Sequence, residues 1–132
     1  MQILANYKLP VFQLSPVENA SFHSQDVKEQ YAHEVIIDKN SLLFQITKQE
    51  RMRVNSHHRR KVDKVGSLKA VAYSEDGIIE AVELPNYPFC LGVQWHPELM
   101  LDYDANMRKL CASFIQACEK KKENILLVKE DY

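Results

Sequence analysis

A chain of 132 residues is long enough for one small domain with a buried core, and short for a two-domain enzyme. Hydrophobic residues make up 45% and charged residues 27%, which excludes a disordered chain. The 17 basic and 18 acidic residues leave a formal net charge of −1, so there is no basic surplus of the kind that nucleic-acid binding uses.

Targeting and redox signals are weak in this sequence. The apolar run at residues 125–128 is far too short to span a membrane, and no basic segment followed by an apolar one opens the chain. We therefore expect a cytoplasmic protein that binds neither membrane nor nucleic acid. Its three cysteines are odd in number and contain no CxxC pair, which argues against a disulfide framework.

The first part of the chain gives little periodic signal. Residues 1–30 include Pro10 and Pro16 and show no sustained hydrophobic period, so we expect irregular structure with a short helix near residues 26–32. The β-rich segment His33–Ile37 then predicts a strand.

The next segments are short. Residues 41–43 predict a helical turn and residues 52–56 predict another strand. The basic residues 59–61 that follow predict a loop or the start of a helix.

A three-stranded meander is the clearest local prediction. Residues 68–73 and 78–84 flank the sequence SEDG, a turn of hairpin length that contains glycine. Residues 90–95 are almost wholly apolar, which is typical of a strand buried on both faces.

A closing helix follows. Either Asp102 or Asp104 can cap it, and apolar residues recur at helical spacing from Met107 to Cys118. The lysines at 120–122 fall in its last turn, where positive charge suits the helix dipole.

The candidate chemical groups are the histidines. Adjacent His57 and His58 would face opposite sides of an extended segment, and three cations follow them, which disfavours a divalent ion there. We therefore expect no metal and no cofactor. All five histidines of the chain are His23, His33, His57, His58 and His96.

His96 stands in the most informative context. Pro97 forces it into an extended conformation, so His96 and Glu98 can point the same way. A carboxylate beside an imidazole fixes its tautomer and stabilises its protonated form, as a general base requires. The alternative, which the spacing leaves open, is a surface histidine before a turn proline.

Three motifs carry a family resemblance. VNSHH at residues 54–58, DGIIEAVE at 76–83 and GVQWHPE at 92–98 resemble, in order and spacing, the C-terminal half of the gamma-glutamyl-gamma-aminobutyrate hydrolase family. That family belongs to the class I glutamine amidotransferase-like superfamily. The resemblance is strongest over residues 30–118. It implies an α/β fold, the C-terminal part of a flavodoxin-like domain, with residues 1–132 forming a partial domain.

The resemblance also implies an activity. Such proteins cleave gamma-glutamyl amides through a Cys-His-Glu triad and a thioester. His96 would be the base and Glu98 its orienting carboxylate, while Asn55, Ser56 and His58 would lie beside the substrate pocket.

Two departures from the family pattern limit this activity. Arg59 and Arg60 stand where the family usually has His and Gln, and no G-x-C-x-G turn for the nucleophile is present. The nearest match begins at Cys90, but it leads into a strand. We expect a fragment that supplies only His and Glu and is inactive alone. The alternative is a non-catalytic binding or interaction module derived from the same fold; a glutaminase unit delivering ammonia to a synthetase ranks below the hydrolase.

The missing half also suggests partners. In the intact fold the central sheet is parallel, so its absence would leave a sheet edge and apolar surface exposed. We therefore expect a homo-oligomer, or association with a complementary N-terminal half that completes the site for a gamma-glutamyl amide.

Overall fold

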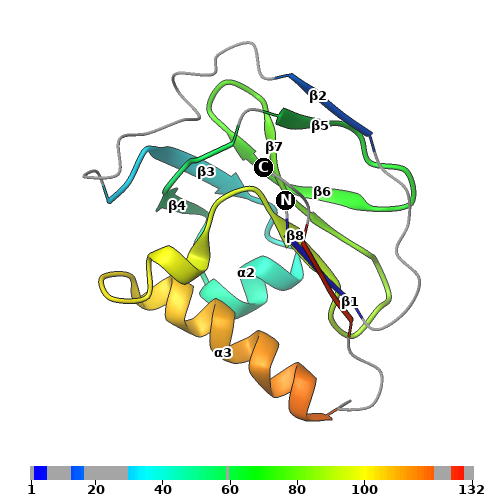
Figure 1. Ribbon diagram of the computed structural model, residues 1–132, viewed down its shortest axis with the longest axis vertical. Helices are drawn as coiled ribbons and strands as arrows, with labels where there is room; N and C mark the ends of the chain where they lie inside the picture. Colours follow the sequence, from blue (N-terminus) through cyan, green and yellow to red (C-terminus); the bar gives the residue numbers. More distant parts are fainter. Residues whose placement is uncertain (1, 6–12, 17–29, 59, 121–125, 130–132) are drawn as a thin grey trace.

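The fold is a sheet with helices on one face and a two-stranded ribbon on the other (Figure 1). The computed structural model describes residues 2–5, 13–16, 30–58, 60–120 and 126–129. The mixed α/β class and the closing helix agree with the sequence-based prediction.

The main sheet has seven strands in the order β4-β3-β6-β7-β8-β1-β9. Every pairing between neighbouring strands in it is antiparallel. Its strands, in chain order, are β1 (Gln2–Ala5), β3 (His33–Ile37), β4 (Arg51–Val54), β6 (Lys69–Ser74), β7 (Ile79–Glu83), β8 (Leu91–Val93) and β9 (Leu126–Lys129). The ribbon pairs β2 (Gln13–Pro16) with β5 (Arg60–Lys64).

The predicted meander is confirmed as β6, β7 and β8. The turn between β6 and β7 is closed by a bond from the Gly77 N–H to the Ser74 carbonyl, at 3.0 Å. Gly77 has φ +84°, a conformation that costs glycine little and other residues more. The Ser74 hydroxyl also contacts Asp76, so the turn is held by side chain and backbone together.

Three predictions about the first half of the chain need correction. Residues 2–5 and 13–16 form strands, not irregular structure. The basic stretch continues into β5 where a loop or helix start was expected. Of the helix expected over residues 26–32, residues 26–29 lie outside the described part, and residues 30–32 are not helical.

The expected bare edge beside β8 is also wrong. Gln2, Ile3 and Leu4 of β1 pair antiparallel with Val93, Gly92 and Leu91. Strand β8 therefore has a neighbour on each side, β7 and β1, and the sheet around it is antiparallel rather than parallel.

Two helices cover one face of the sheet. The short helix α2 (Leu42–Thr47) is capped by Ser41, whose hydroxyl accepts the Phe44 N–H. The long helix α3 (Ala105–Lys120) is capped by Asp104, whose carboxylate accepts the Met107 N–H at 3.0 Å. The structure thus selects Asp104 from the two predicted caps.

Side-chain alternation along the strands separates two cores. Ala81 packs in the larger core beneath the helices, whereas the next residue, Val82, packs in a smaller core with Val62 of the ribbon. Trp95 anchors the larger core, since its indole N–H lies 3.2 Å from the Met107 sulfur. The helix face and the end of β8 are thereby fixed to each other.

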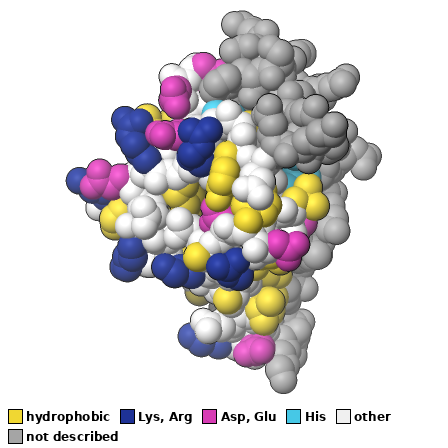
Figure 2. Space-filling model, turned by 90° about the vertical axis from the view of Figure 1, so that its left-hand side faces the viewer, with side chains coloured by type: hydrophobic (Ala, Val, Ile, Leu, Met, Phe, Trp, Pro, Cys, Tyr) yellow, Lys and Arg dark blue, Asp and Glu magenta, His cyan; other side chains and the backbone are white. Residues whose placement is uncertain are grey.

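The surface carries both signs of charge. On the face drawn in Figure 2, Lys and Arg side chains are interspersed with Asp and Glu. Exposed ion pairs include Lys39–Glu50 and Lys69–Asp38. Within the described residues, no helix combines the length and apolarity needed to cross a membrane.

A pair of aliphatic residues on α3 tests the packing. Leu110 is buried against the sheet and Ile115 is 56% exposed. We expect Leu110→Ala to lower the free energy of unfolding by about 2–5 kcal/mol, because a cavity replaces packed atoms. Ile115→Ala should change it by less than about 0.5 kcal/mol. Urea denaturation measures both, and equal losses would contradict this placement of α3.

Candidate active site

The candidate site lies at one edge of the sheet. Because neighbouring strands are antiparallel, β4 and β8 end at the same edge where β3 and β7 begin. Residues 55–58, which follow β4, meet the residues that follow β8 across that edge. Three of the motifs singled out in the sequence therefore converge, although they are far apart along the chain.

His96 and Glu98 are in contact, as predicted. The Nδ1 atom of His96 lies 2.7 Å from Oε1 of Glu98. Glu98 belongs to the single-turn 3-10 helix η1 (Pro97–Leu99), which Pro97 starts. Because an ionised carboxylate only accepts hydrogen bonds, Nδ1 is the protonated ring nitrogen of neutral His96. Their catalytic roles remain predictions.

Asn55 binds the backbone of His96 at both polar groups. Its Oδ1 accepts the His96 N–H at 2.8 Å, and its Nδ2 donates to the His96 carbonyl at 3.0 Å. The Asn55 side chain is buried. Sequence reasoning placed Asn55 beside the substrate pocket, and the structure places its amide on His96.

His57 and His58 contact different neighbours, as their adjacency suggested. The His57 ring packs edge-on against His96, with centroids 5.9 Å apart. Burial lowers the pKa of His57, and the nearby His96 lowers it further. His57 is therefore neutral over a wider pH range than a free histidine.

His58 lies in a buried cluster with Glu80 and His33. The Nε2 atoms of His58 and His33 are 3.6 and 3.9 Å from Oε2 of Glu80, and all three residues are buried. Ser56, also buried, lies in the same segment. Sequence reasoning missed Glu80 and gave His33 no role. The only available signal was an acidic residue within an otherwise apolar strand.

The cysteines are poorly placed and poorly ionised. Cys90 precedes β8 whereas His96 follows it, so the strand separates the two residues. Burial raises the pKa of Cys90 and of Cys111, which disfavours the thiolate that attacks an amide. Cys118 lies in the last turns of α3.

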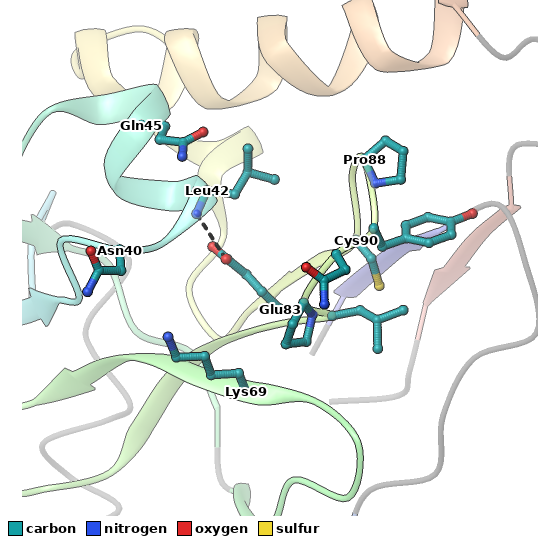
Figure 3. A pocket seen from close by; sticks show the side chains of 11 residues that line it. Asn40, Leu42, Gln45, Lys69, Glu83, Pro88 and Cys90 are labelled. Atoms are coloured by element: carbon teal, nitrogen blue, oxygen red, sulfur yellow. Dashed lines mark hydrogen bonds between the residues drawn. The ribbon is translucent and has the colours of Figure 1, made fainter.

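A cavity of about 330 Å³ lies at the end of β7 and β8 opposite to His96 (Figure 3). In this view Glu83 points to the start of α2, where its carboxylate accepts the N–H groups of Leu42 and Leu43 at 2.9 and 2.8 Å. Burial nevertheless raises the pKa of Glu83. Cys90 lines this cavity, remote from the candidate site.

Other predicted groups have simpler outcomes. In the described ranges, no group of three or more His, Cys, Asp or Glu is arranged to hold a metal ion. Arg59 and His23 lie outside the described residues, and Arg60 is the first residue of β5.

The chain belongs to the Peptidase C26 family, whose model matches residues 11–98. It is 41% identical over 97 residues to the gamma-glutamyl-gamma-aminobutyrate hydrolase PuuD of Escherichia coli, covering 70% of this chain and 38% of that protein. It is 38% identical over 86 residues to protein NtpR of Enterococcus hirae, covering 64% and 36% of the two chains. The chain thus spans well under half the length of these relatives.

Solved structures support the class I glutamine amidotransferase-like fold. The glutaminase domain of Trypanosoma brucei CTP synthase, with bound acivicin, has a TM-score of 0.57 at 24% identity, covering 74% of this chain and 44% of that one. A GMP synthase component from Thermoplasma acidophilum has a TM-score of 0.62 at 16% identity, covering 85% of this chain and 51% of that one.

The titration of His57 tests the site geometry. Because its pKa is lowered on folding, we expect an NMR midpoint below the ordinary value of about 6.5. Neutral His57 then contributes stability above that pH, which is lost as the pH falls through the folded midpoint. In His96→Gln the midpoint should rise, though not fully, since burial is the larger cause. A wild-type midpoint at or above about 6.5 would contradict the packing.

Proposed function

We propose that this chain is the C-terminal portion of a gamma-glutamyl hydrolase, and that it supplies the base and orienting acid of a Cys-His-Glu triad. His96 takes the proton from a cysteine thiol and later activates the water that releases glutamate. Glu98 holds the ring with Nδ1 protonated, so that Nε2 is the basic atom. The 2.7 Å contact between His96 and Glu98 is the observation that carries the proposal.

The nucleophile, in this proposal, comes from a segment outside this sequence. Two of the three cysteines have a raised pKa, and Cys90 lies at the wrong end of β8. The relatives are more than twice as long as the aligned region. A complementary segment would therefore bring the cysteine and the oxyanion donors to His96, which completes the covalent route.

The substrate contacts are proposed for the segment after β4. Ser56 and His58 lie between His96 and the buried Glu80, within one segment of extended chain. This supports a gamma-glutamyl amide bound along that segment, with its scissile carbon near His96. The charge of Glu80 favours a hydrogen-bonding rather than a purely apolar contact from His58.

Reconstitution tests the proposal. We expect the chain alone to release no glutamate from gamma-glutamyl amides, and activity to emerge when it is co-expressed with the N-terminal half of a relative such as PuuD. His96→Ala should then lower kcat by about 10²–10⁴-fold, the usual contribution of a general base. Glu98→Gln should lower it as well, by removing the charge that stabilises the imidazolium.

The matched control is Glu75→Gln, since Glu75 is an exposed carboxylate in the β6–β7 turn. It should leave the reconstituted activity unchanged. A stable complex without activity would refute the hydrolase proposal and favour a non-catalytic binding module. Activity that survives His96→Ala would show that the base lies elsewhere.

A further inference from the structure

The backbone of His96 lies where regular structure stops. The last bond between β7 and the chain after β8 runs from the Gln94 N–H to the Glu80 carbonyl. Two residues later the chain has φ −113° and ψ 86° at His96, and then enters η1 at Pro97. At such a junction the polar groups of the backbone need partners from outside the sheet.

The Asn55 amide supplies one donor and one acceptor to this junction. A backbone N–H can only donate and a carbonyl can only accept, so the two contacts at 2.8 and 3.0 Å fix the amide in a single orientation. The His96 carbonyl also accepts the Leu99 N–H at 3.1 Å. One atom is thus shared between Asn55 and the turn that carries Glu98.

We propose that Asn55 is a positioning residue for His96, whose amide fixes the backbone at His96 and thereby holds the imidazole on Glu98. Because the imidazole and the carboxylate are only two residues apart, a rotation of this backbone separates Nδ1 from Oε1. The role rests on the proposed function of His96 as a base, and it assigns the Asn55 amide to the protein rather than to the substrate.

The location of Asn55 gives this contact structural leverage. Asn55 follows β4, the edge strand, and His96 follows β8, four places further along the sheet order. The bond therefore joins two segments 41 residues apart across the ends of β3, β6 and β7. The side chain is 2% exposed, so water competes little for either hydrogen bond.

The tautomer of His96 measures this role without any catalytic assay. In the full chain with ¹⁵N-labelled histidine, we expect the Nδ1–H form of neutral His96 to predominate. Asn55→Ala should lower the ratio of the Nδ1–H to the Nε2–H form about threefold or more, as expected for loss of a net hydrogen bond. Asn55→Asp should do the same, because its carboxylate cannot donate to the His96 carbonyl.

Controls separate positioning from general destabilisation. Asn40→Ala removes an exposed asparagine and should leave the tautomer ratio of His96 unchanged. The His33 resonances, from the same sheet edge, should remain as in the wild type in both Asn55 variants. An unchanged His96 ratio in a folded Asn55→Ala chain would overturn the proposal.

A measurement on the unmodified chain covers variants that fail to fold. A through-hydrogen-bond scalar coupling between Asn55 Nδ2 and the His96 carbonyl carbon is expected, and its absence would overturn the proposal. Glu98→Gln tests the other premise: a His96 tautomer that ignores this change would refute the His–Glu pair and hence the proposed function. The coupling to Asn55 does not depend on that result, so the two failures are distinguishable.

Discussion

The burial of Glu80 is the constraint on which the candidate site depends. A carboxylate removed from water is costly unless polar groups surround it, and here two imidazoles lie within 4 Å of one of its oxygens. His33 comes from the start of β3 and His58 from the segment after β4. Solvating this one group therefore draws three parts of the chain to the same sheet edge, and residues 55–57 are carried toward His96 as a consequence.

The site then divides into a buried part and an accessible part. The cluster around Glu80 and the amide of Asn55 are closed to water, whereas Glu98 is 45% exposed at its side chain and His96 is 13% exposed. Proton transfer needs access at the imidazole and rigidity behind it. Asn55 joins the two parts, because its position follows from the buried cluster and its bonds end on His96.

How much the sequence could predict varied with the range of the interactions involved. The β6–β7–β8 meander and α3 depend on local periodicity and on a glycine turn, and both were recovered. The contact of His96 with Glu98 needs only one short extended segment, so it was predictable as well. Strands β1, β2 and β5 were missed, because their pairing partners lie far away in the sequence and their own residues show no alternation. Glu80 was missed for a related reason: within its strand it is one polar residue, and its meaning comes from two histidines that tertiary structure brings to it.

The pairing of β8 limits how a nucleophile can reach His96. Both sides of β8 are occupied, by β7 and by β1, so a segment that adds a strand beside β8 must first displace β1. The other end strand toward the site, β4, presents exposed Arg51 and Arg53, and charged side chains on an edge strand discourage further pairing. The ends of the strands, where His96 emerges, carry no such obstacle in the ladder itself. A complementary segment therefore has two routes: exchange with β1, which would expose the backbone of residues 2–5, or docking across the strand ends, which leaves the sheet intact. The second route keeps every described strand pair, and on that ground it is the less costly way to complete the site.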